Sequence, residues 1–218
     1  MCRSIFSDAV NAARQQILPR EFAMPVLPFL VLTASLIFSS PVYSDVYKID
    51  NDHTTIGFKI RHLVSWLSGT FNDFDGQIVF DPSDPSAWKA DAVIQTASID
   101  TANEKRDEHL RTADFFNVKE NPSMTFKSTG FSEVTEKSAK MQGDLTINKV
   151  TKPVTLDVEI HGTGKDPWGN ERFGATAETT INRKDFNLGW NQALETGQFL
   201  VGEEVKITLE IEGIKEQA

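Results

Sequence analysis

The residue types that commonly carry out catalysis or bind metals are few in this sequence and widely spaced. Its four histidines are His53, His62, His109 and His161, and no two have the His-Xaa-Xaa-Xaa-His spacing typical of zinc ligands on a helix. The single cysteine is Cys2, and neither a Gly-Xaa-Ser-Xaa-Gly elbow nor a Gly-rich phosphate loop followed by lysine occurs. The sequence therefore predicts no catalytic residues, no metal site and no resident cofactor. We expect a binding protein and not an enzyme.

One segment concentrates charged side chains that could meet a ligand. Asn103–Ala113 contains neither Gly nor Pro and predicts a single short helix. Within about two turns it carries Arg106, Asp107, His109 and Arg111. In one interpretation, a basic side chain of this helix binds the polar head group of a ligand. In the other, the charges pair with one another in solvent, and the following Phe115 and Phe116 anchor the helix.

The elements that must position these side chains are strands, because apolar and polar residues alternate through most of the sequence after Ser44. The clearest examples are residues 154–160 and 205–211. We expect about eight or nine antiparallel strands of about 8–12 residues, longer than the usual strand. Residues 62–67 are expected to form one turn of helix. Long strands with one apolar face, together with a single short helix, favour an all-β barrel over a sandwich.

The interior of such a barrel is expected to be rich in phenylalanine. Of the 15 Phe residues, four precede residue 44 and eleven follow it. Phe58, Phe80, Phe126 and Phe173 lie on the apolar faces of predicted strands and must point inward. Mixed with small residues, they either fill a solid core or line an apolar tunnel, and the periodicity does not decide between the two.

An apolar run without charge occupies residues 26–38. It is shorter than the roughly 20 residues that a membrane-spanning helix needs, and small residues follow it before Asp45, as in a secretory signal peptide. We expect residues 1–44 to be this signal peptide, with Met24 as an alternative start, and 45–218 to be one barrel domain without a stable membrane span. The other interpretation of the run is an uncleaved anchor or a buried helix.

The charge balance limits the partners of this domain. Three of the 22 basic and two of the 31 acidic residues lie in the expected signal peptide, which leaves 19 basic and 29 acidic residues and a net charge of −10. Nucleic acid and anionic membrane surfaces are bound through clustered Lys and Arg. No dense basic run occurs, so the acidic balance is expected to repel both nucleic acid and anionic membrane surfaces, and we expect no nucleic-acid partner.

Several segments, taken together in order, resemble the YceI-like family of bacterial periplasmic proteins. The resemblance covers essentially all of residues 45–218. It rests on Asp50, His53, Thr54, Ile56, Phe58, Ile60 and His62, then on residues 69–76, 99–101, 106–110, 113–116, 121–126, 145–147, 151–154 and 181–186.

The resemblance implies a fold, a ligand and a location. The fold is a lipocalin-like antiparallel barrel of about eight strands with one short helix inserted. The protein is expected to be located in the periplasm. Its apolar interior is expected to hold a polyisoprenoid chain, such as that of a quinone or an isoprenyl phosphate. We expect the interior to be lined by Phe58, Ile60, Phe71, Phe80, Phe126, Leu145, Ile147, Leu156 and Phe173, with Arg106, His109 or Arg183 near the mouth. A homodimer is compatible with this expectation.

Two turns depart from the family pattern. After the Arg-Xaa-Asp-Phe segment the family usually carries Gly, whereas this chain has Asn187 and reaches glycine only at Gly189. After the Leu-Xaa-Ile segment, the usual Gly is replaced by Asn148 or Lys149. Because Asn tolerates a positive φ better than other non-Gly residues, we expect both turns to be kept.

Two rival functions remain open from the sequence. One is an enzyme that uses the barrel as a substrate pocket, with His109 and Asp107 as acid and base. The other is a packed barrel that acts through its surface in envelope stress or assembly, which predicts a solid interior.

Overall fold

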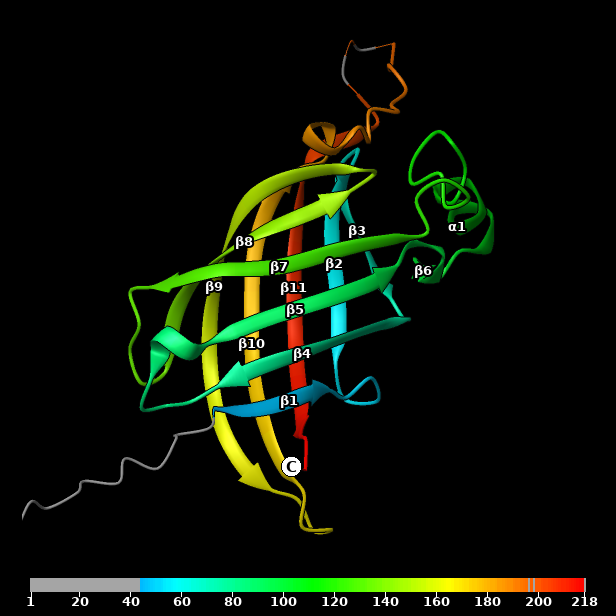
Figure 1. The fold of residues 1–218 in the computed structure, drawn as a ribbon. Helices are drawn as coiled ribbons and strands as arrows, with labels where there is room; N and C mark the ends of the chain where they lie inside the picture. Colours follow the sequence, from blue (N-terminus) through cyan, green and yellow to red (C-terminus); the bar gives the residue numbers. More distant parts are fainter. Residues whose placement is uncertain (1–43, 196, 198, 218) are drawn as a thin grey trace, which may run out of the picture. The chain divides into compact units, whose positions relative to one another are not determined.

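Strands that pair into one continuous sheet make up most of the described chain (Figure 1). The computed structural model describes residues 44–195, 197 and 199–217. The strands are β1 (Asp45–Ile49), β2 (Thr55–His62), β3 (Ser65–Phe71), β4 (Phe74–Phe80), β5 (Lys89–Gln95), β6 (Ile99–Asp100), β7 (Ser123–Ser132), β8 (Ser138–Ile147), β9 (Val150–Lys165), β10 (Glu171–Asn182) and β11 (Val201–Lys215). The helical elements are α1 (Glu104–Leu110) and the short 3-10 helices η1 (Pro85–Ala87), η2 (Thr96–Ser98) and η3 (Arg183–Phe186).

Eight of these strands close into an antiparallel barrel. The order around the ring is β1-β4-β5-β7-β8-β9-β10-β11, and it closes because β1 pairs with β4 on one side and with β11 on the other. Closure leaves no free edge in the ring, so the backbone groups that an open sheet would expose are paired. The predicted fold, an all-β barrel with one short helix, is confirmed.

Strand β11 is long enough to pair with two strands along the same edge. Its carboxyl-terminal part pairs with β1, as at Lys215 opposite Tyr47, and its amino-terminal part pairs with β2, as at Val205 opposite Ile60. β2 then continues into β3, and β3 pairs briefly with β6. These three strands extend the sheet beyond the ring and bring it next to α1, which follows β6 (Figure 1).

The turns with unusual residues keep the geometry that the sequence requires. Asn148, Lys149 and Asn187 all have positive φ, at 48°, 63° and 61°. Two of the three are Asn, whose short polar side chain is compatible with this region. The expectation that both turns survive without glycine is confirmed.

The helix prediction is confirmed, and the prediction of a second helical turn is wrong. The side chain of Asn103 caps α1 by accepting a hydrogen bond from the amide of Arg106 at 3.1 Å. At 62–67 the chain instead makes a hairpin, with a two-residue turn between β2 and β3. Cross-strand pairing of Ile60 with Leu67, which both face the interior, outweighs the local helical pattern.

Residues 1–43 lie outside the described residues, and with them nearly all of the expected signal peptide. In the part of the chain that the structure describes, no helix is long and apolar enough to cross a membrane.

Candidate functional site

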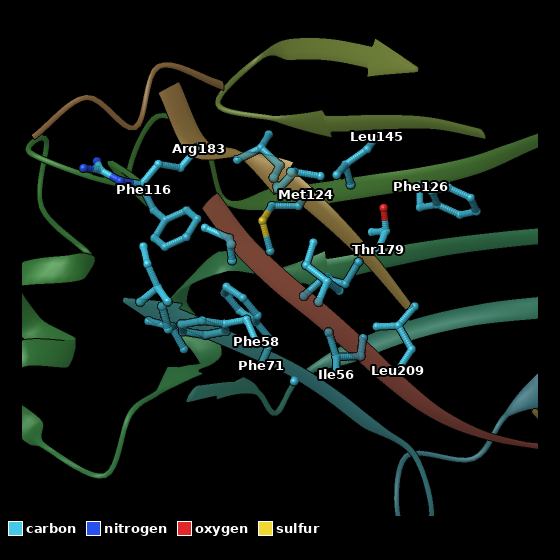
Figure 2. A pocket seen from close by; sticks show the side chains of 18 of the residues that line it. Ile56, Phe58, Phe71, Phe116, Met124, Phe126, Leu145, Thr179, Arg183 and Leu209 are labelled. Carbon is cyan, nitrogen blue, oxygen red and sulfur yellow. The ribbon is translucent and has the colours of Figure 1, made fainter. Parts of the chain in front are cut away.

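The barrel encloses an apolar cavity of about 480 Å³. Every described strand contributes a residue to its wall, and Figure 2 shows Phe58 of β2, Met124 of β7 and Leu145 of β8 converging on it. Alternation places these side chains inside, because every second residue of a barrel strand points inward. The rival interpretation of a solid interior does not fit this hollow barrel.

Most of the residues that the sequence predicted for the site do line this cavity. The apolar ones are Phe58, Ile60, Phe71, Phe126, Leu145, Ile147 and Leu156, and the basic ones are Arg106, His109 and Arg183. Their position in the wall agrees with the expectation, while their role in binding stays a prediction.

Phe80 and Phe173 are the exceptions, since neither is among the lining residues. Both are buried in an aromatic cluster that we call the aromatic plug, formed by Tyr47, Phe80, Trp88, Phe131 and Phe173. The ring centroids of Phe80 and Phe173 lie 4.7 Å apart, and those of Phe80 and Trp88 lie 4.9 Å apart. The plug therefore fills this part of the barrel, and the cavity ends against it.

The opposite end of the cavity is bounded by α1 and by the connection between η3 and β11. Lys105, Arg106 and His109 of α1 line it together with Trp190 and Leu200 of the connection. Phe173 and Ile181 mark the two ends along β10, since the first belongs to the plug and the second lines the cavity near this opening. We call this end the mouth.

An aromatic cluster joins the two sides of the mouth. The ring of His109 lies 5.0 Å from the ring of Trp190 and 5.2 Å from that of Phe115, both edge-on, and Phe115 and Trp190 are 5.2 Å apart. Such contacts are individually weak, at about 0.5–1.5 kcal/mol each beyond area burial. The mouth is therefore covered by contacts that can open at modest cost. No sequence pattern predicts the position of Trp190, because it lies in an irregular segment without the alternation of a strand.

Arg106 and Asp107 of α1, with Arg111 at its C-terminal cap, mainly hold the helix in place. Asp107 is buried, and its Oδ1 accepts hydrogen bonds from the amide of Thr101 at 3.0 Å and from the Thr101 hydroxyl at 2.5 Å. Arg106 donates from Nε to the same hydroxyl and from Nη2 to the Thr101 carbonyl, both at 2.7 Å. Arg111 donates from Nε to the carbonyl of Ala97 and from Nη2 to that of Ile99, both at 2.8 Å. These contacts match neither sequence interpretation in full. The charged side chains are hydrogen-bonded mainly to backbone groups and to Thr101, and not to one another in solvent or to a ligand head group.

The acid and base of the enzyme interpretation are not paired. His109 Nε2 lies 2.8 Å from Asp114 Oδ2, on the exposed side of the helix, and Asp107 is engaged by Thr101. Within the described ranges, the hydroxyls of Thr54 and Thr179 in the cavity wall are hydrogen-bonded to the carbonyls of Glu212 and Thr155, not to His109 or Asp107.

Arg183 of η3 is only 2% exposed and supports the wall of the mouth from behind. It donates from Nε to the carbonyl of Gly202 at 2.7 Å, and from Nη1 to the carbonyls of Trp190 at 2.9 Å and of Leu188. Burial lowers the pKa of its guanidinium, which the charge of Glu203 partly opposes. Its Nη2 is buried and has no hydrogen-bond partner within the described chain. Figure 2 places the guanidinium on the same side of the cavity as Phe116. Its hydrogen bond to the Trp190 carbonyl holds the connection between η3 and β11.

One group of acidic and histidine side chains within the described ranges has ligand atoms close enough together for a metal ion, namely Asp50, His53 and Glu212. Arg172 already lies among them, with Nη1 at 2.7 Å from Asp50 Oδ2 and 2.5 Å from Glu212 Oε1. The guanidinium therefore already occupies the position between the two carboxylates and pairs with both of them.

The cavity and the fold can be compared with known proteins. The model of the YceI-like domain matches residues 47–213. Protein YceI of Escherichia coli O157:H7 is 44% identical over 189 residues, which cover 84% of this chain and 95% of that protein. The YCEI protein of Campylobacter jejuni has a solved structure with a TM-score of 0.63 and 36% identity, covering 77% of this chain and 96% of that one.

A more distant structure shares the fold alone. It is a polyisoprenoid binding domain from Saccharophagus degradans implicated in plant cell wall breakdown, with a TM-score of 0.59 at 14% identity. The match covers 78% of this chain and 98% of that one.

Proposed function

The chain belongs to the YceI-like family, and from this premise we propose that it binds a polyisoprenoid or a similarly long apolar lipid inside its barrel and carries it in the periplasm. The observation that carries the proposal is the cavity of about 480 Å³ with an almost wholly apolar wall. This volume lies in the range of roughly 300–1,000 Å³ that is usual for small-molecule sites. The name of the Saccharophagus degradans domain supports a polyisoprenoid as the ligand class.

The physical reason for binding is the removal of apolar surface from water. Each Å² of a prenyl chain that enters the cavity gains about 25 cal/mol. A wall of side chains such as Phe58, Leu145 and Leu156 offers few directional contacts. The cavity therefore selects for a slender apolar shape more than for particular functional groups.

The aromatic plug limits how far a prenyl chain of the ligand can enter the cavity. Because the cavity ends against Phe80 and Phe173, a ligand must enter from the mouth and leave its head group there. Lys105, Arg106 and His109 are the polar side chains of α1 that line this end of the cavity. A quinone or an isoprenyl phosphate fits such an arrangement.

Binding without turnover is part of the proposal. Asp107 and His109 are each engaged by a different partner, so the pair that an enzyme would need is not assembled. The periplasmic location rests on the apolar run at residues 26–38 and the small residues after it.

A variant that fills the cavity tests the proposal. Ala92 lines the cavity and lies opposite Phe126 in the sheet, so Ala92→Trp places an indole where the ligand would lie. We expect at least about a tenfold loss of affinity for a prenyl alcohol, because less apolar ligand surface is buried. Thr129→Trp on the exposed side of β7 is the matched control and should bind normally. Equal affinity of both folded variants would place the ligand outside the barrel and contradict the proposal.

A further inference from the structure

The hairpin between β2 and β3 ends in an exposed apolar turn. The two turn residues are Leu63, which is 46% exposed, and Val64, which is 88% exposed. Trp66 follows on β3 at 48%, and Phe199 of the neighbouring connection is 58% exposed. The amide of Leu63 donates to the carbonyl of Leu200 at 2.9 Å, which holds that connection beside the hairpin. We call Leu63, Val64, Trp66 and Phe199 the apolar tip.

The apolar tip is not explained by the stability of the hairpin. Two-residue hairpin turns favour Asn-Gly or Asp-Gly, because their residues need positive φ. Here Leu63 adopts a φ of 51°, which costs free energy for a branched side chain. Exposing Leu63 and Val64 to water adds a further cost. The side chains at this turn are therefore better suited to an apolar surrounding than to solvent.

Basic side chains surround Trp66. The ammonium group of Lys206 lies 5.0 Å from the Trp66 ring centroid, and the guanidinium carbon of Arg61 lies 6.0 Å from it. Lys59 is the cross-strand partner of Lys206. None of these three cations takes part in an ion pair with another described residue, although the whole chain has a net charge of −9. Three cations without an ion-pair partner among the described residues therefore gather beside the apolar tip.

The apolar tip continues the wall of the cavity outward. His62 and Leu67 line the cavity and flank the hairpin turn, and Leu200 and Val201 line it directly after Phe199. A lipid that leaves the mouth would therefore pass next to Leu63 and Phe199. In Figure 1 the end of β2 lies beside the connection that leads into β11.

We propose that the apolar tip docks onto an anionic lipid bilayer and places the mouth of the cavity at the membrane surface. Val64 and Leu63 enter the boundary of the acyl chains, Trp66 lies at the level of the head groups, and Lys59, Arg61 and Lys206 contact lipid phosphates. Tryptophan together with Lys and Arg is the composition that membrane interfaces favour. The net negative charge of the protein opposes docking only weakly, because charges more than about 8 Å away are screened at physiological salt. The choice of a bilayer over another partner rests on the proposed function, since a lipid of the class that fits the cavity is stored in membranes.

Flotation with vesicles of phosphatidylethanolamine and phosphatidylglycerol tests the apolar part of the proposal. The protein is produced from its full sequence, and intact mass shows that all variants share one amino terminus. We expect Val64→Asp to lower the bound fraction at least about tenfold, because an aspartate at this depth must be desolvated. Trp168→Asp is the matched control, since Trp168 is 80% exposed in the turn between β9 and β10 and should leave flotation unchanged.

The charged part is tested on the same vesicles. Each lysine near an anionic surface strengthens binding about fivefold, so the double variant Lys59→Gln, Lys206→Gln should lose more than tenfold and become less sensitive to salt. Lys127→Gln on the outside of β7 is the control, and it should behave as the unaltered protein. Vesicles of phosphatidylcholine alone should bind the unaltered protein more weakly.

Several outcomes would overturn the proposal. They are no flotation of the unaltered protein, equal flotation of the Val64→Asp and unaltered proteins, and equal loss with Trp168→Asp. Sedimentation that shows a dimer broken by Val64→Asp, with no vesicle binding, would assign the apolar tip to a second copy of the chain. Uptake of a prenyl alcohol is measured separately without vesicles. Retained uptake with no flotation refutes the docking alone, and flotation without uptake refutes the proposed function alone.

Discussion

The ring of Phe126 on β7 lies directly over Gly143 on β8. A Cβ atom on Gly143 would come within 2.3 Å of Phe126 Cζ, so the ring occupies the space that any other residue would need. Phe58 has the same relationship with Gly69, at 2.5 Å. Both rings line the cavity, and each is pressed against the backbone of the neighbouring strand. The two glycines thus keep the cavity open by letting large rings lie flat against its wall.

Gly143→Ala should push the Phe126 ring into the cavity. We expect a loss of stability of about 1–3 kcal/mol from overpacking, together with weaker binding of a prenyl alcohol. Gly130→Ala in the same strand pair is the control, because the nearest atom to its added Cβ is the Gln142 Oε1 at 3.7 Å. Thermal unfolding and ligand titration of both variants check this, and equal behaviour of the two would contradict it.

Phe126→Glu should abolish ligand binding, because a carboxylate in an apolar cavity must be desolvated or protonated. The side chain is half-buried, so the variant is expected to fold, which circular dichroism verifies. Unchanged affinity in the folded variant would mean that the ligand does not contact this wall.

Shortening the aromatic plug should lengthen the ligand that fits. Phe173→Leu replaces a ring that packs against Phe80 and Tyr47 with a smaller side chain, at a cost of about 1–3 kcal/mol in stability. We expect the preferred prenyl chain to become longer in a titration with chains of increasing length. An unchanged length preference would show that the plug does not limit the cavity.

Trp190→Ala should speed ligand exchange, because Trp190 joins the connection before β11 to His109 and Phe115 of the opposite side. We expect a dissociation rate several-fold higher, since about 0.5–1.5 kcal/mol per aromatic contact is lost. Stopped-flow measurements with a fluorescent prenyl ligand test this, and Trp168→Ala serves as the control. Equal rates would indicate another exit route.

Stability in acid should depend on Arg172, whose Nε and Nη1 lie 2.9 Å and 2.7 Å from carboxylate oxygens of Asp166 and Asp50. Burial raises the pKa of both carboxyl groups, but hydrogen bonds from Arg172 and other neighbours outweigh it and hold each pKa below its usual value. A lowered pKa in the folded state stabilises the fold above the unfolded value of about 3.9, and this stabilisation is lost as the pH falls through the folded-state pKa.

Arg172→Met should therefore cost about 3 kcal/mol at neutral pH and reduce the loss of stability below about pH 4. Urea unfolding at a series of pH values measures both effects. Lys140→Met is the control, because its pair with Asp157 is exposed and contributes little. The same acid dependence in Arg172→Met and in the unaltered protein would show that other carboxyl groups dominate.

The sequence predicts the fold more completely than it predicts the residues of the site. Alternation determines which side chains of a strand face inward, and Phe58, Phe126 and Leu156, which it predicts to face inward, line the cavity. Alternation does not give the height of a residue along the barrel, which depends on strand register. Phe80 and Phe173 therefore belong to the plug although their strands show the same pattern.

The part of the mouth that Trp190 forms could not be predicted, because tertiary contacts between irregular segments position it. Trp190 is held by a carbonyl contact with Arg183 and by the ring of His109, and neither contact has a sequence period. The hairpin at Leu63 was missed for a related reason. Its turn lacks the usual Gly or Asn, and the pairing of β2 with β3 determines its conformation.

The most direct test of the central claim is native mass spectrometry of the protein purified from its own host, followed by organic extraction. A lipid inside the barrel predicts one apolar adduct per chain that is released on unfolding and contains a prenyl chain. A clean mass without adduct, together with no uptake of prenyl compounds on incubation, would contradict the account.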